Sequence, residues 1–359
     1  GWRAWQELRP LRSYGFLSYA NRRILSNVTF YATNLCDSKC THCGIWEQRP
    51  IHYLPPEIFQ QVHDSPATDE NTVFGFEGGE FVLHPQADEI LSVYRNRKIE
   101  LYSNGLKPDR VIRLVTDHQI PHLIVSLDGR RDTYLRIRGV DGYERVVSLV
   151  ETLLNKTRIS ISYTLTPWNN LDDFRFVRDF CRERGITFGI NIMHNARFFD
   201  RDILLKGIPF ASEENLPQEH PVKLDYFLLY NEWLQGKVQL PCTSIFHRIV
   251  VYPNGDIPLC QEGRTGVLGN LKENRLEDIW WSRKVWRMQR DRIGCNGCWI
   301  SFHRYDDLIA YRAGRSLVPE WMIRFWMRHG KWQKLEHLGQ NGSKISSQTG
   351  EIEHMPVSE

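Results

Sequence analysis

Strands and helices alternate regularly through the first half of the chain, and this alternation limits the possible folds more than any other feature of the sequence. Short apolar runs typical of buried strands lie at residues 28–32, 73–76, 99–102, 123–127, 159–165 and 186–193. Segments with helical periodicity separate them, at residues 56–63, 85–95, 109–116, 143–154 and 171–184. Such repeats build a parallel sheet with right-handed crossovers. We therefore predict an α/β fold, either an open partial barrel or a doubly wound sheet.

Polar loops follow four successive predicted strands. A cysteine-containing loop follows the first strand, Glu77–Glu80 follows the second, Ser103–Gly105 follows the third, and Asp128–Gly129 ends the fourth. In either candidate fold, ligands bind at the carboxyl ends of parallel strands. We therefore expect these four loops to meet on one face and to form a single site.

Three cysteines of the first loop are spaced to reach one centre. Three residues separate Cys36 from Cys40, and two separate Cys40 from Cys43. Three thiolates leave one iron of a 4Fe–4S cube without a protein ligand, whereas ferredoxin-type carriers usually ligate every iron with cysteine. A small molecule can coordinate the open iron, which favours chemistry over electron transfer alone. The alternative is a zinc site that takes His42 or His52 as its fourth ligand.

The segment from Cys36 to Cys43 resembles the Cys-x3-Cys-x2-Cys signature of the radical S-adenosylmethionine (SAM) family, in which an aromatic residue or a histidine commonly precedes the third cysteine. The loops after the next three strands are similar to the family's Gly-Gly-Glu, Thr-Asn-Gly and ribose-contacting segments, with Ser103 in place of threonine. The resemblance covers about residues 28–195 and implies the following SAM contacts: Gly78, Gly79, Glu80, Ser103, Asn104, Ser126, Asp128, Arg138 and His42.

This resemblance implies a fold and a reaction. It favours a partial (β/α)6 barrel of the TIM type over the doubly wound sheet. The amine and carboxylate of SAM would chelate the open iron, with Glu80 accepting from the amine and Arg138 facing the carboxylate. Reductive cleavage of SAM would then give a 5′-deoxyadenosyl radical that takes hydrogen from a substrate.

A second cysteine set lies in the C-terminal half: Cys242, Cys260, Cys295 and Cys298. It is similar to the truncated, "twitch" form of the SPASM domain, which implies one auxiliary 4Fe–4S cluster with full cysteine ligation, so that two clusters are expected in all. A four-cysteine zinc site is the alternative. We predict a small domain with a β-hairpin at 248–259, because Asn254-Gly255 favours a tight turn, and a helix at 276–290. Cys181 lies in a helical pattern and is expected to pack in the core.

The second cluster suggests the type of reaction. With every iron ligated, it is expected to accept an electron from a substrate radical, which amounts to dehydrogenation of an alcohol, a sugar or a peptide side chain. Radical peptide crosslinking and modification of a lipid or small molecule are the alternatives within this class. A non-catalytic binding protein with two metal sites is the alternative of a different class.

The same pattern divides the chain. We expect a basic and aromatic helical extension (1–26), the partial barrel (27–208), a linker (209–235), the auxiliary-cluster domain (236–310) and a C-terminal helix with a polar tail (311–359). The expected partners are a small-molecule or peptide substrate and an electron donor such as flavodoxin or ferredoxin.

Charge and hydropathy bear on the location and on other partners. The formal net charge is +3, and no basic run is long enough for a nucleic-acid tail, so no nucleic acid is expected. The chain shows no signal-peptide core and no apolar span of membrane length, so we expect a cytoplasmic protein. The basic and aromatic segment 320–332 could contact a membrane peripherally, although packing on the barrel is favoured.

Overall fold

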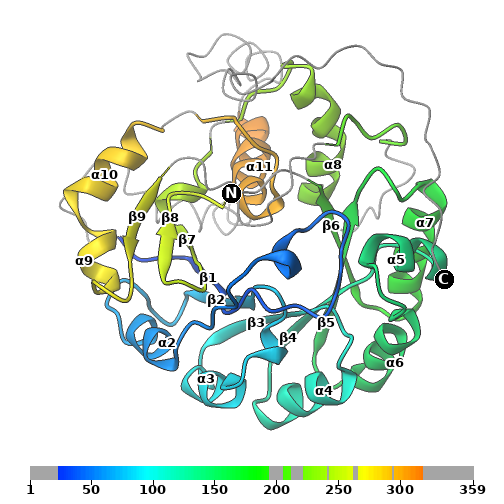
Figure 1. Cartoon of the computed structure of the whole chain (residues 1–359). Coiled ribbons are helices and arrows are strands. Elements are labelled where there is room, and N and C mark those ends of the chain that lie inside the picture. The colour runs from blue at the N-terminus through cyan, green and yellow to red at the C-terminus, as the bar shows by residue number, and fades with distance from the viewer. Residues whose placement is uncertain are drawn as a thin grey trace.

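The structure is a computed structural model that describes residues 23–193, 205–211, 221–240, 242–261, 266–292 and 295–317. A curved sheet runs through the molecule, helices cover its outer side, and a small region of short strands and helices lies beside one of its edges (Figure 1). The predicted α/β partial barrel is confirmed.

Seven parallel strands form the sheet in the order β6-β5-β4-β3-β2-β1-β7. Their bounds are β1 Asn27–Tyr31, β2 Val73–Glu77, β3 Lys98–Ser103, β4 His122–Ser126, β5 Arg158–Leu165, β6 Thr187–Ile192 and β7 Arg248–Val251. All six predicted strands are present, and sequential strands pair side by side, so the carboxyl ends of β1 to β6 meet at one rim. This rim holds the loops that the sequence singled out.

The crossover helices also match the predicted ones. They are α2 Pro56–His63, α3 Ala87–Val93, α4 Pro108–Asp117, α6 Tyr143–Leu153 and α7 Leu171–Glu183. Each turns an apolar stripe toward the sheet; in α4, Val111, Leu114 and Val115 are buried at helical spacing. Cys181 of α7 is buried in the same core, as predicted. An additional short helix, α5 Arg131–Arg138, was not predicted.

The predicted hairpin at 248–259 is wrong in its pairing. The turn does form, since Gly255 has a φ of +92° and its N–H donates to the Tyr252 carbonyl over 2.8 Å. However, the strand before the turn is β7, which joins the main sheet beside β1. The strand after it, β8 Asp256–Pro258, pairs antiparallel with β9 Val267–Asn270. β7 is parallel to its neighbour and apolar on both sides, which suits the barrel edge better than a solvated hairpin.

The rest of the C-terminal region is helical. The predicted helix at 276–290 is two helices, α9 Leu276–Trp280 and α10 Arg283–Arg290, because Ser282 caps a new helix by accepting from the Val285 N–H over 3.1 Å. Helix α8 Pro221–Leu234 lies within the segment assigned to a linker at 209–235. Helix α11 Ser301–Leu317 crosses the expected domain boundary at residue 310.

Helix α11 fills the gap between the two edge strands of the open sheet. The Tyr305 hydroxyl donates to the Ile190 carbonyl of β6 over 2.8 Å. On the other side, Asp306 accepts from the Arg248 guanidinium of β7, with an N···O distance of 2.7 Å. The helix therefore connects β6 to β7 through its side chains, and its backbone lies between the two edges of the sheet (Figure 1).

Two expectations fall outside the described residues: the helical extension at 1–26, apart from its last four positions, and the basic and aromatic segment 320–332. In the part of the chain that the structure describes, no helix combines the length and apolar character that crossing a membrane requires.

Candidate active site

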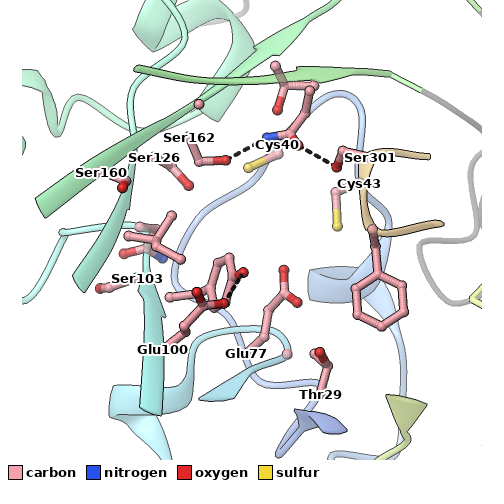
Figure 2. Close-up of a pocket in the computed structure, with 18 of the residues that line it drawn as sticks. Thr29, Cys40, Cys43, Glu77, Glu100, Ser103, Ser126, Ser160, Ser162 and Ser301 are labelled. Carbon is pink, nitrogen blue, oxygen red and sulfur yellow. Dashed lines mark hydrogen bonds between the residues drawn. The ribbon is translucent and has the colours of Figure 1, made fainter. Parts of the chain in front are cut away.

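A cavity of about 560 Å³ opens inside the barrel. Its lining comes from strands β1 to β7, from the cysteine loop after β1 and from the start of α11 (Figure 2). Eight of the nine residues expected to contact SAM lie along it: Gly78, Gly79, Glu80, Ser103, Asn104, Ser126, Arg138 and His42. Cys36, Cys40 and Cys43 line the same cavity. The structure thus brings the four predicted loops together at one rim.

The three thiols form a site that lacks the positive charge needed to stabilise them as thiolates. Burial, the Glu80 carboxylate and the neighbouring Cys40 raise the pKa of Cys36 well above its ordinary value. Thiolates at this site therefore require a positive centre to stabilise them. Donors already face the sulfur atoms: Arg138 Nη1 lies 3.7 Å from Cys40 Sγ, and Asn104 Nδ2 lies 3.8 Å from Cys36 Sγ. These features fit an iron–sulfur cluster held by three cysteines.

The two glycines of the second loop shape the cysteine loop. The Gly79 N–H donates to the Thr33 carbonyl over 2.7 Å, and the Glu80 N–H donates to the Leu35 carbonyl over 2.8 Å. A Cβ atom on Gly79 would lie 2.2 Å from the Leu35 oxygen, and one on Gly78 would lie 2.7 Å from the Thr33 oxygen. The glycines thus allow close contact between two backbones, in addition to the approach to a ligand that the sequence suggested.

Glu80 is a buried carboxylate of the rim, with 2% of its surface exposed. It accepts from the Asn104 N–H over 2.7 Å and so ties the second loop to the third. Burial raises the pKa of Glu80 to about 7, although the Asn104 N–H opposes the shift. A cationic ligand beside this carboxylate would restore its ionised form.

Arg138 ends helix α5 and is held by Asp128. Its Nη2 lies 2.5 Å from Asp128 Oδ2, and both side chains are buried. Burial alone would lower the pKa of Arg138, but Asp128 and Cys40 outweigh it and raise that pKa. Asp128 also accepts from the Thr164 N–H over 2.8 Å and does not line the cavity. It is therefore placed to position the arginine, and the expected contact between Asp128 and SAM stays a prediction.

The short helix α5 also supports the cysteine loop directly. The Lys39 N–H donates to the Arg138 carbonyl over 2.9 Å, and the Thr41 N–H donates to the Ile137 carbonyl over 2.9 Å. Gly139 ends the helix with a φ of +66°, and a Cβ atom there would lie 2.5 Å from the Lys39 oxygen. Sequence reasoning found Arg138 but missed the helix that carries it.

His42 and His52 were the candidate fourth ligands of the alternative zinc site. His42 lines the cavity, and burial lowers its pKa to about 4, which keeps the ring neutral. His52 is exposed and does not line the cavity. Within the described ranges, no three His, Cys, Asp or Glu side chains are arranged to hold a single metal ion. The thiolates of a 4Fe–4S cluster bind different irons and do not share one centre.

The second cysteine set gathers beside the cavity. The Cys242 N–H donates to the Cys295 carbonyl over 2.8 Å. Burial raises the pKa of Cys298 to about 12, with Cys260 and Cys295 adding to the shift. Arg304, fully buried, donates to the Cys298 carbonyl over 2.7 Å and supplies a positive charge. These four cysteines form no disulfide in the structure, and the set fits an auxiliary cluster.

The first cysteine set lines the cavity, and residues next to the second set in sequence line the same cavity. Gln261, directly after Cys260, lines it, as do Ile300 and Ser301, which follow Cys298 closely. The Gln261 amide also donates to the Tyr31 hydroxyl of β1. No sequence pattern predicted this wall, because only the fold brings residues 261 and 300–302 to the barrel.

The barrel interior is polar, which sequence reasoning also missed. The residues concerned include Thr29, Glu77, Glu100, Ser160, Ser162, Asn191 and Ser301 (Figure 2). Asn191 Nδ2 donates to Ser162 Oγ over 2.8 Å, and Ser301 Oγ donates to Asn191 Oδ1 over 2.7 Å. A signal was available, because Glu100 and Tyr102 alternate with buried apolar residues along β3.

Comparisons with known proteins agree with this geometry. A family model described as the Radical SAM superfamily matches residues 30–181, and one described as an iron–sulfur cluster-binding domain (SPASM) matches residues 242–299. No curated protein matches significantly.

Solved structures share the fold. Streptococcus suis SuiB bound to precursor peptide SuiA is 17% identical, with a TM-score of 0.60, over 82% of this chain and 75% of that one. Native anSMEcpe with bound AdoMet is 14% identical, with a TM-score of 0.50, over 81% of this chain and 98% of that one. The chain belongs to the radical SAM superfamily, carries a SPASM-type iron–sulfur domain, and has 4Fe–4S clusters and SAM as its cofactors.

Proposed function

We propose that this enzyme oxidises a small molecule or a peptide bound in the barrel cavity, with the auxiliary cluster as electron acceptor. One observation carries the proposal: the cavity lined by Cys36, Cys40 and Cys43 is also lined by Gln261 and Ser301, which neighbour the auxiliary cysteines. A substrate bound between the two sites could lose a hydrogen atom at the SAM site and an electron to the auxiliary cluster.

The residues divide the work as follows. Cys36, Cys40 and Cys43 would hold the first cluster, with Arg138 and Asn104 donating toward its sulfur atoms. Glu80 would accept from the amine of SAM, while Gly78, Gly79, Ser103, Ser126 and His42 would border the bound molecule. Asp128 would hold Arg138 in place. When bound, SAM and the first cluster supply the radical that takes a hydrogen atom.

The oxidation balances in atoms and electrons. A substrate carbon would lose a hydrogen atom to the radical that SAM supplies when bound. Cys242, Cys260, Cys295 and Cys298 would hold the auxiliary cluster, which would supply the acceptor for one electron of the substrate radical, while one proton would leave to a base or to water. The product is oxidised by two electrons. An electron donor such as flavodoxin or ferredoxin would reduce the first cluster for the next turnover.

A peptide reaction is the second candidate. SuiB has been solved with precursor peptide SuiA, and anSMEcpe with AdoMet and the Cp18Cys peptide. The likeness in fold makes radical modification or crosslinking of a peptide the main competitor to oxidation of a small molecule. Both use the same cavity and the same first cluster.

Replacing Cys295 and Cys298 together with alanine tests the role of the auxiliary site. The double variant should still cleave SAM, because the first site is intact, but it should release no oxidised product. Iron content, circular dichroism and SAM binding control for folding, since a lost cluster also loosens its domain. A folded double variant that forms full product would refute the electron-acceptor role while leaving the family assignment intact.

A further inference from the structure

One carboxylate inside the barrel has no counter-charge. Glu77 is the last residue of β2, and its side chain points into the cavity below Cys43 (Figure 2). Among the residues that the structure describes, none forms a hydrogen bond or ion pair with this carboxylate. A carboxylate inside a protein normally has such a partner, because burying a charge without one costs several kcal/mol.

The other carboxylates, lysine and arginines of the cavity have partners within the protein. The pairs are Glu80 with the Asn104 amide, Glu100 with His122 and Tyr102, Arg138 with Asp128, Arg248 with Asp306, and Lys223 with the Phe188 carbonyl. None of these cations pairs with Glu77 in the structure. A cationic molecule that enters the cavity would supply the missing counter-charge.

The surroundings of Glu77 favour an organic cation. Glu100 is near enough to contribute to the raised pKa of Glu77, so two acidic groups share this part of the cavity. The Glu77 charge also acts on the hydroxyl groups of Tyr31 and Tyr102, which places two aromatic side chains beside it. Carboxylates together with aromatic rings are the usual receptors for ammonium and guanidinium groups.

We propose that Glu77 binds a positively charged nitrogen of the substrate, a protonated amine or a guanidinium group. The inference rests on the proposed function in one respect, that this cavity is where the substrate binds. Glu77 would hold the charged end of the molecule inside the barrel, at the carboxyl end of β2. It is a specificity residue, distinct from Glu80, which lies at the rim and belongs to the SAM site.

Two probes that differ only in charge test this assignment. N-acetyl-lysine amide carries an ammonium group, and N-acetyl-norleucine amide is its uncharged analogue. Binding of each to the anaerobically reconstituted enzyme with SAM is measured by calorimetry or saturation-transfer NMR. The lysine amide should bind the unmodified enzyme at least about tenfold more tightly, as expected for one charge-assisted hydrogen bond.

Three variants make the test specific. Glu77→Gln should abolish the preference for the charged probe, and Glu77→Asp should retain part of it. Glu70→Gln, which removes an exposed carboxylate, should leave the preference unchanged. Iron content and circular dichroism show whether each variant is folded and loaded.

Two results would overturn the proposal: equal binding of both probes to the unmodified enzyme, or a preference that survives in folded Glu77→Gln. A parallel loss of SAM affinity in Glu77→Gln would also overturn it, because Glu77 would then belong to the SAM site. A different measurement tests the proposed function: it would be refuted if the unmodified enzyme did not cleave SAM or formed no oxidised product.

Discussion

Asp128 holds Arg138 through a buried ion pair in which Oδ2 and Nη2 are 2.5 Å apart. The aspartate lies behind the arginine, away from the cavity, and also accepts a backbone N–H from β5. The direction in which the guanidinium points, toward Cys40, is therefore set by a residue outside the cavity lining.

Asp128→Asn should destabilise the protein and weaken SAM binding. Breaking a buried pair leaves Arg138 without its counter-charge, which costs about 3–5 kcal/mol. Thermal unfolding and calorimetric SAM titration measure the two effects. Asp141→Asn, which breaks the exposed pair with Arg131, is the matched control and should change neither quantity measurably. If Asp128→Asn unfolded at the same temperature as the unmodified protein, the positioning role would be contradicted.

Gly79→Ala should disrupt the first cluster and spare the second. The new methyl group would lie 2.2 Å from the Leu35 carbonyl oxygen, so the cysteine loop would have to move. Iron analysis should then give about half the iron of the unmodified protein, because only the other cysteine set remains intact. Gly185→Ala, where a Cβ atom meets nothing within 4 Å, should keep both clusters. Full iron content in Gly79→Ala would show that the loop does not depend on this contact.

Glu80→Gln should lower SAM affinity by about tenfold or more while cluster content stays unchanged, because the lost charge faces the ligand and not the iron. Glutamine keeps an oxygen that can accept from the Asn104 N–H, so the loop after β3 should stay in place. Calorimetry with the reconstituted variant measures the affinity. An unaltered dissociation constant would remove Glu80 from the SAM site.

Glu77→Gln should change how stability depends on pH. Burial and Glu100 raise the pKa of Glu77 from 4.5 to about 7. A raised pKa means that the folded state favours the protonated acid, so this contribution is full below about pH 4.5 and is lost as the pH rises through 7. Without ligand, the variant should gain about 1–3 kcal/mol relative to the unmodified protein between pH 5 and pH 8. Thermal unfolding at both pH values measures the gain, and a stability difference that does not change with pH would show that the pKa of Glu77 is not raised in the folded protein.

The sequence predicted the barrel well because each strand and each helix can be recognised from the pattern of apolar residues in a short segment. It also placed Cys36, Glu80 and Asn104 at strand ends, and strand ends of a parallel sheet share a rim. The pairing of β7 was not predictable in this way, since the turn at Asn254-Gly255 looks the same whichever strands it joins. The residues of a turn determine its conformation, whereas the pairing of a strand depends on which edge of a sheet is free to accept it.

The polar interior was missed for a related reason. Glu77 was interpreted as part of the glycine motif, although its place at the end of β2 directs it into the barrel. Ser160 and Ser162 likewise alternate along β5 with buried apolar residues. A barrel filled only by its own side chains would carry apolar residues at these positions, so this alternation indicates a cavity that holds a polar molecule.

The connection that α11 makes between β6 and β7 has a consequence for how the chain is synthesised. The strand β1 emerges early from the ribosome, yet one of its two neighbours, β7, is made only after β6 and α8. Until α11 follows, the outer edges of β6 and β7 also remain uncovered, and uncovered edges of a sheet invite pairing with other chains. A fragment that ends after β6 should therefore aggregate, and a nascent chain should need protection from chaperones until residue 317 has left the exit tunnel.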